Sequence, residues 1–102
     1  EIPAKVVYED ERTMAFHDIA PQARVHILII PKKHIPTMMD ATEADLPLIA
    51  DIHAAIQKVA RQIGVAESGF RLINNCGQGG GQEVFHIHYH LLGGQKLGPK
   101  IV

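Results

Sequence analysis

The chain has 102 residues, of which 46% are hydrophobic and 21% are charged, and its formal net charge is −1. This size fits one compact domain over residues 1–102, and the balanced charge, with no block of like charges, argues against electrostatic binding of nucleic acid. No apolar run reaches the ~20 residues of a membrane-spanning segment, so no membrane partner is expected.

Cys76 is the only cysteine in the chain, so no intramolecular disulfide can form. A single cysteine is typical of proteins from a reducing compartment, and we expect a cytoplasmic location. Because no initiator methionine is present, we also expect both termini to be trimmed from a longer natural sequence.

The first part of the chain predicts three strands. Residues 5–9 and 13–16 are rich in β-branched and aromatic side chains, and the polar break between them indicates a hairpin. Residues 18–23 are typical of a loop, because Pro21 disfavours helical backbone at Ala20. Residues 25–30 then predict a third strand, which Pro31 ends.

Residues 42–63 predict the one long helix. Their apolar side chains recur at intervals of three and four and form one stripe, Leu46, Ile49, Ile52, Ile56, Val59 and Ile63. Thr42 and Asp45 resemble a capping box, but Pro47 would then lie beyond the first turn, so the regular helix is expected to begin at Asp45. Gly64 is the expected stop.

The remaining segments predict two more strands. Residues 70–75 alternate weakly, the glycine-rich loop 77–82 follows, and residues 85–92 alternate strictly between apolar side chains and histidines. The predicted fold class is therefore α+β, a five-stranded antiparallel sheet with one long helix packed on it.

The strand over residues 85–92 would place three imidazoles on one face. Same-face neighbours in a strand are ~6.6 Å apart, so His86 and His90 would stand ~13 Å apart, too far to share one metal ion readily. A metal site would need another ligand such as His26, and three unrelated surface histidines are a further alternative.

Nucleophilic catalysis explains the pattern better. A neutral imidazole is a good nucleophile towards phosphorus, and His88, the middle one, would be oriented by its neighbours His86 and His90. Gly79, Gly80 and Gly81 just upstream would let backbone N–H groups approach an anion without Cβ interference, although glycine runs are more often flexible connectors.

Four segments carry a resemblance to a known family. They are HIHYHLL at His86–Leu92, AFHDIAPQA at Ala15–Ala23, HILIIPKKH at His26–His34 and GGQEVF at Gly80–Phe85. The first is similar to the histidine triad signature HxHxHxx, and the chain resembles the HIT superfamily of nucleotide hydrolases and transferases over nearly its whole length. Gly93-Gly94 after the triad resembles the Hint branch of bacterial type.

The resemblance implies a purine nucleoside phosphoramidase, which cleaves the P–N bond of AMP or GMP linked to an amine. The central histidine, here His88, would form a nucleotidyl-histidine intermediate that water hydrolyses. His86 and His90 would support it, and His26 would match the family's fourth active-site histidine. No metal or other cofactor is expected, and the sheets of two copies would join in a homodimer.

The resemblance also implies a nucleotide pocket. Asp18 would accept hydrogen bonds from the ribose hydroxyls, and the base and phosphate positions are Phe16, His17, Ile19, Asn75, Gly81, Gln82, Glu83 and Val84. Gly81 and Val84 would act mainly through backbone N–H groups. Glu83 departs from the pattern, because many Hint proteins have a serine there, and leaving-group protonation is therefore unassigned.

Two other functions remain open from the sequence. One is a dinucleoside polyphosphate hydrolase of the Fhit branch, against which Phe85 and Gly93-Gly94 argue, and the other is a nucleotide-binding adaptor with little turnover. Phe16 and Ile19 could be core residues and Asp18 a turn residue. We interpret His34 as structural and His53 as a packing or partner-facing residue.

Overall fold

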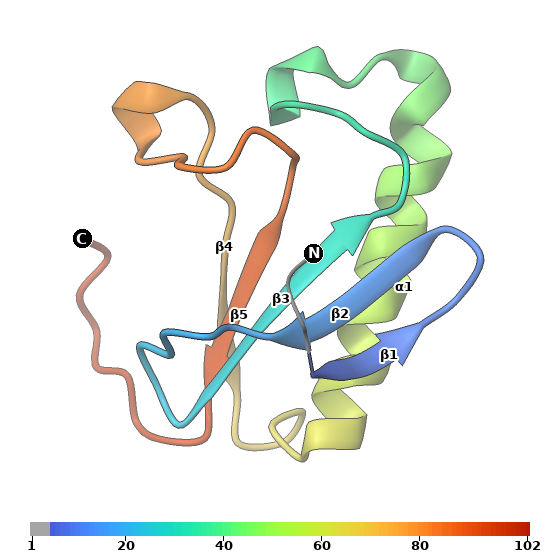
Figure 1. The fold of residues 1–102 in the computed structure, drawn as a ribbon. Helices are drawn as coiled ribbons and strands as arrows, with labels where there is room; N and C mark the ends of the chain where they lie inside the picture. The colour runs from blue at the N-terminus through green and yellow to red at the C-terminus, as the bar shows by residue number, and fades with distance from the viewer. Residues whose placement is uncertain (1–4) are drawn as a thin grey trace.

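The computed structural model describes residues 5–102, and within them the chain forms a five-stranded antiparallel sheet and one long α-helix (Figure 1). The elements are β1 (Val6–Glu9), β2 (Thr13–His17), β3 (Val25–Pro31), α1 (Leu46–Ile63), β4 (Phe70–Ile73) and β5 (Tyr89–Gly93). Three one-turn 3-10 helices lie in the connections, at Met38–Asp40, Glu43–Asp45 and Gln78–Gly80. The predicted fold class is confirmed.

The strand order is β1-β2-β3-β5-β4, so the histidine-bearing strand β5 lies between β3 and β4. Its register with β3 sets Leu28 opposite His90 and His26 opposite Leu92. The predicted hairpin of β1 and β2 is confirmed. Asp10 holds its turn through hydrogen bonds from the N–H groups of Arg12 and Thr13, at 2.9 Å and 2.8 Å.

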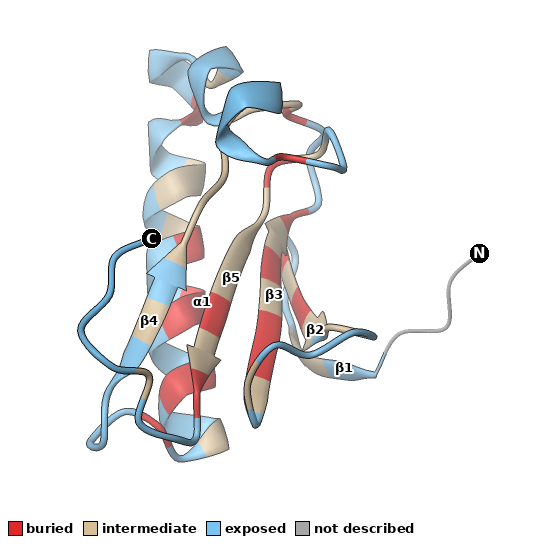
Figure 2. Ribbon diagram, turned by 90° about the vertical axis from the view of Figure 1, so that its left-hand side faces the viewer, coloured by how far each residue is buried: buried red, intermediate tan, exposed pale blue. Residues whose placement is uncertain are grey.

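Helix α1 covers one face of the sheet, and the core lies between them, where the buried segments of α1 face β3 and β5 (Figure 2). Ile52, Ile56 and Val59 supply the helix side of this core, as the apolar stripe predicted. Leu46 was wrongly placed in the stripe: it is the first residue of α1 and is 56% exposed. Ala55 and Ala60 are buried instead.

The helix ends follow local chemistry. Glu43–Asp45 forms a 3-10 turn before α1, and the Asp45 carboxylate accepts the Thr42 N–H at 2.9 Å, so the helix begins one residue after the predicted Asp45. At the other end Gly64 takes a left-handed conformation with φ +92° and donates its N–H to the Ala60 carbonyl. Within residues 5–102, no helix has the length of apolar sequence needed to cross a bilayer.

Candidate active site

The candidate site lies on the sheet face opposite α1. Alternation along β3 turns Ile27 and Ile29 into the core, so His26, Leu28 and Ile30 face the other way. The register adds Phe16 of β2 and His90 of β5, each directly opposite Leu28, to the same face. Helix α1 therefore supports the sheet from behind while this face carries the functional side chains.

The segment Phe85–His88 is not part of a strand, which corrects the predicted strand over residues 85–92. Only His90 of the three triad histidines lies in β5. Continuing the register in which Ile29 opposes Tyr89 would set Ile87 opposite Pro31, and Pro31 has no N–H to donate. The ladder stops there, so the ~13 Å separation expected of His86 and His90 in a strand does not apply.

His88 has a defined tautomer. Its Nδ1 lies 2.8 Å from the backbone carbonyl oxygen of His86, and a carbonyl can only accept a hydrogen bond. Nδ1 therefore carries the proton, and Nε2 of the neutral ring carries the lone pair. A lone pair on Nε2 is what a nucleophilic histidine needs.

His86 supports His88 in another way than expected. Its Nε2 lies 2.7 Å from the Pro31 carbonyl oxygen and its Nδ1 lies 3.1 Å from Nδ1 of His34. The His86 ring therefore faces the segment after β3, and its backbone carbonyl, not its side chain, orients His88. His34, interpreted from sequence as structural, is a direct partner of the triad.

His26 and His90 form the second histidine pair. His26 is 5% exposed, and its Nδ1 accepts the Gln22 backbone N–H at 3.0 Å. Its proton is therefore on Nε2, which donates to Nδ1 of His90 at 2.9 Å. The neutral His90 ring then carries its own proton on Nε2. The rings of His90 and His88 meet edge to face, with 5.1 Å between their centroids.

The environment favours the neutral form of His90, because it lowers the pKa of the ring. Burial lowers its pKa from the ordinary value of 6.5, positive charge on His88 and His26 lowers it further, and the Asp18 carboxylate acts in the opposite direction. A neutral His90 can donate one hydrogen bond without adding charge to the site.

The same residues fit a metal ion poorly. Asp18, His26 and His90 are the one group in the described part of the chain with donor atoms close enough to hold an ion, all within 4.8 Å. Binding would need the lone pair of His26 Nε2, but the Gln22 N–H already occupies Nδ1 and keeps the proton on Nε2. The cluster contains His26, the additional ligand named from sequence, but of the three triad histidines it includes His90 alone.

A cleft of about 480 Å³ opens beside His86 and His88. It is lined by Phe16, His17, Asp18, Ile19, Ala20, Leu28, Ile30, Glu83, Val84, His86 and His88. The size suits a small-molecule ligand, and the lining combines apolar side chains with a few polar ones. Six of the predicted nucleotide-binding positions are brought together with two triad histidines. Ile19 and Val84, 82% and 64% exposed, belong to its wall.

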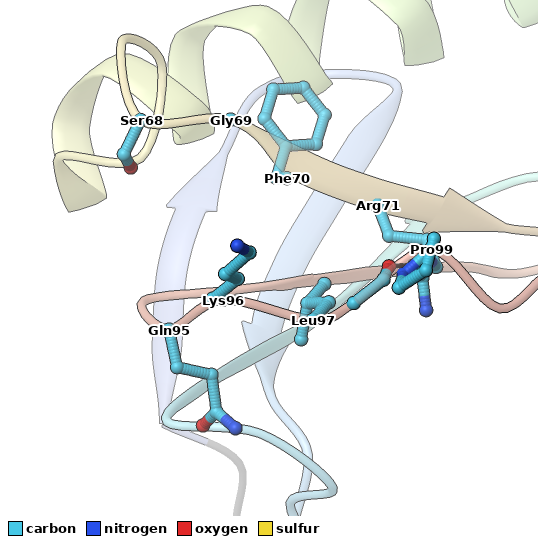
Figure 3. Close-up of a pocket in the computed structure, with 9 residues that line it drawn as sticks. Ser68, Gly69, Phe70, Arg71, Gln95, Lys96, Leu97 and Pro99 are labelled. Atoms are coloured by element: carbon cyan, nitrogen blue, oxygen red, sulfur yellow. Dashed lines mark hydrogen bonds between the residues drawn. The ribbon is translucent and has the colours of Figure 1, made fainter.

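A second hollow, about 550 Å³ in volume, lies between the start of β4 and the segment Gln95–Pro99 (Figure 3). Ser68, Phe70, Arg71 and Lys96 are among its lining residues, and no histidine is. We therefore assign the chemistry to the cleft beside the triad.

Asp18 has one carboxylate oxygen already engaged. Oδ1 accepts the Ala20 N–H at 2.8 Å, which is the turn role that the sequence left open. Oδ2 lies 3.5 Å from Nε2 of His26 and faces the histidine cluster. The turn role and a ligand-binding role are compatible, because they use different oxygens.

The glycine loop differs from its predicted form. The N–H groups of Gly80, Gly81 and Gln82 all donate to carbonyls within the loop, to Gly77, Gln78 and Gly77. The expected phosphate contact through the Gly81 N–H is therefore already used. Among residues 5–102, the N–H groups of Glu83 and Val84 have no internal acceptor and remain available to a ligand.

Gln82 is a structural clamp. It is 5% exposed, its Oε1 accepts the Gly77 N–H at 2.8 Å, and its Nε2 donates to the carbonyls of Pro36 and Val84 at 2.7 Å and 3.0 Å. Its side chain therefore fixes the loop, and these hydrogen bonds engage both its amide nitrogen and its amide oxygen. Gln82 and Asn75 both lie outside the cleft lining.

Sequence reasoning missed Asn74. Its Nδ2 donates to the backbone carbonyl of His88 at 2.9 Å, and its buried Oδ1 has no partner within the described residues. A pair of asparagines directly after a strand was the available signal, because short amide side chains often bond to nearby backbone. Asn74 thus holds the backbone of the histidine whose ring faces the cleft.

Comparison with known proteins identifies the family of the chain. The HIT domain family matches residues 1–97. A purine nucleoside phosphoramidase from Escherichia coli (strain K12) is 50% identical over 101 residues, which cover 99% of this chain and 85% of the relative. A HIT family hydrolase from Clostridium thermocellum superimposes with a TM-score of 0.96 and 53% identity, covering 99% of this chain and 88% of that chain. A histidine triad protein from Clostridium difficile gives a TM-score of 0.93 and 47% identity, covering 97% and 86%.

The chain therefore belongs to the HIT domain family, and the resemblance drawn from its histidine motif is confirmed.

The environment of His90 gives a titration test. We expect its ring to titrate below 6.5 in an NMR pH series, because burial and the neighbouring histidines disfavour its imidazolium form. Asp18→Asn should lower the midpoint further, since Asp18 is the group that raises the pKa of His90. Glu83→Gln, another cleft carboxylate, is the matched control and should leave it unchanged. A midpoint at or above 6.5 in the unmodified protein would contradict this account.

Proposed function

We propose that the chain hydrolyses the P–N bond of purine nucleoside 5′-monophosphoramidates, with Nε2 of His88 as the nucleophile. One observation carries the proposal: the hydrogen bond from His88 Nδ1 to the His86 carbonyl leaves Nε2 as the reactive nitrogen of a ring that lines the cleft. The 50% identity to a purine nucleoside phosphoramidase supports the substrate class.

The cleft divides into parts that suit the parts of a nucleotide. Phe16, Leu28 and Ile30 form an apolar floor for a flat purine base. Oδ2 of Asp18, the oxygen not used by Ala20, would accept hydrogen bonds from the ribose hydroxyls. The base and ribose are thereby held on the sheet face, with the 5′ side towards the histidines.

The phosphate would lie between His88 and the segment Glu83–Val84. The N–H groups of these two residues are the available donors. The Val84 N–H was expected from sequence, and the Glu83 N–H takes the place of the expected Gly81 contact. Preorganised donors of this kind stabilise the charge that develops on phosphate oxygens. The proton on Nε2 of His90 supplies one further donor close to His88.

The reaction proceeds in two displacements. Nε2 of His88 attacks phosphorus, the P–N bond to the amine breaks, and the departing nitrogen takes up a proton. The His88 ring becomes cationic at this step, and its hydrogen bond to the His86 carbonyl strengthens because the donor is now charged. Water then attacks phosphorus and loses a proton, which balances the proton taken up by the amine. The bond from phosphorus to Nε2 breaks, the nucleoside monophosphate departs, and His88 is neutral again.

Replacing His88 tests the proposal most simply. His88→Ala should lower kcat towards an adenosine 5′-phosphoramidate by roughly three orders of magnitude or more, because the nucleophile is lost. The melting temperature and the affinity for AMP should change little, since other residues line the pocket. His53→Ala, which removes an exposed histidine of α1, is the matched control and should keep full activity.

The alternatives predict different results in the same assays. A Fhit-type enzyme would hydrolyse diadenosine triphosphate faster than the phosphoramidate. An adaptor module would bind AMP but show slow hydrolysis that His88→Ala does not reduce. Either result would contradict the proposed function.

We also propose that residues 1–102 form one HIT domain that assembles as a homodimer through β4. This strand is at the end of the sheet and pairs on one side only among the described strands. Its Phe70 and Leu72 are 38% and 42% exposed and lie two residues apart, on the same face of the strand. A second copy of β4 would extend the sheet and cover them. The cytoplasmic location stays a prediction.

Substitutions on the two edge strands of the sheet, β4 and β1, test the proposed dimer interface. Leu72→Glu should raise the dimer dissociation constant at least tenfold in light-scattering or sedimentation measurements, because it would bury a charge at the interface. Val6→Glu changes an exposed apolar residue, 50% exposed, on the other edge strand β1 and should leave assembly unchanged. A monomeric parent protein, or dissociation by Val6→Glu alone, would contradict the proposal.

A further inference from the structure

The last residue of β3 and the segment that follows it hold the triad through three contacts. The Pro31 carbonyl lies 2.7 Å from Nε2 of His86, and Nδ1 of His34 lies 3.1 Å from Nδ1 of His86. The Ile35 carbonyl accepts the N–H of Ile87 at 2.7 Å. All three contacts converge on the residues just before His88.

These contacts determine where the protons lie. The Pro31 carbonyl can only accept, so Nε2 of His86 carries a proton and Nδ1 of the neutral ring carries a lone pair. The facing nitrogen of His34 must then be the donor, with its proton on Nδ1. Both ring nitrogens of His86 form hydrogen bonds, so the ring cannot flip by 180° without losing both of them.

The peptide unit between His86 and Ile87 links these contacts to the orientation of the His88 ring. A trans peptide is planar, and its N–H and C=O point in opposite directions. The Ile35 carbonyl fixes the N–H of Ile87, so the carbonyl of His86 points the other way, to Nδ1 of His88. Ile87 is 1% exposed and Ile35 is 3% exposed, so both flanks of this peptide are packed.

We infer that His34 is a positioning residue for His88: by donating Nδ1–H to Nδ1 of His86, it holds the peptide whose carbonyl fixes the nucleophile's tautomer and ring angle. The inference rests on the proposed function of His88. His34 itself is not among the cleft-lining residues, so it acts through His86. His34 is also exposed, so its removal should cost little stability.

Two substitutions of His34 separate the effect of its hydrogen bond from the effect of losing the side chain's volume. His34→Ala removes the donor, whereas His34→Asn places Nδ2, an N–H donor, near the position of the imidazole Nδ1. His34→Ala should lower kcat roughly tenfold, the rate equivalent of one hydrogen bond, with KM little changed. His34→Asn should restore kcat to within about threefold of the parent by the same reasoning. His53→Ala is the control for loss of an exposed histidine.

A spectroscopic readout keeps the inference independent of turnover. In ¹⁵N NMR of the histidine rings, the parent should show His88 protonated on Nδ1 alone and His86 on Nε2 alone. His34→Ala should shift His88 towards a mixture of tautomers, and His34→Asn should not, while melting temperatures of both variants stay close to the parent's.

The outcomes separate the two proposals. No phosphoramidase activity in the parent would overturn the proposed function, while the NMR comparison would still decide the role of His34. An unchanged His88 tautomer and unchanged kcat in His34→Ala would overturn the inference. Equal loss in His34→Ala and His34→Asn would also overturn it, because the donor would then not be the cause.

Discussion

The hydrogen bond from Nδ1 of His88 to the carbonyl of His86 is the constraint on which the site depends. It leaves Nε2 as the nitrogen of His88 that carries a lone pair, and in the proposed mechanism it would become stronger when the ring acquires positive charge. A backbone carbonyl suits this role, because it can only accept and therefore permits a single tautomer. The roles of the other histidines follow from their relation to this bond.

Pro31 explains how an antiparallel sheet gives rise to such a bond. Its missing N–H ends the pairing of β3 with β5, which frees residues 85–88 from the strand. Its carbonyl is then available to the His86 ring, and the chain after it supplies His34 and Ile35. On the other flank, Gln82 fixes the glycine loop and Asn74 holds the His88 backbone. His88, the proposed nucleophile, is thus held between two irregular segments above a regular sheet.

Much of this architecture was predictable from local pattern. The alternation in residues 25–30 divides β3 into a core face and a functional face, and the helical stripe identifies Ile52, Ile56 and Val59 as core. Two residues of the histidine motif, His86 and His88, line the cleft beside β5. These features depend on periodicity within one segment, which sequence records directly.

The errors have a common cause. The strand break at residues 85–88 depends on the register between Pro31 and Ile87, which lie 56 positions apart, and no local pattern encodes it. The Gly81 N–H and the Gln82 side chain looked available to a ligand because their partners within the loop are not visible in sequence. His34 was interpreted as structural because its link to His86 exists only in three dimensions.

The most direct test identifies the atom of His88 that bonds to phosphorus. Protein labelled with ¹⁵N in its histidine rings would be quenched in alkali during turnover of an adenosine 5′-phosphoramidate. Mass spectrometry would then locate the adenylated residue, and NMR would detect the ³¹P–¹⁵N coupling that identifies the bonded nitrogen. The account predicts adenylyl bonded to Nε2 of His88. Adenylyl on Nδ1 of His88, or on another residue, would contradict it.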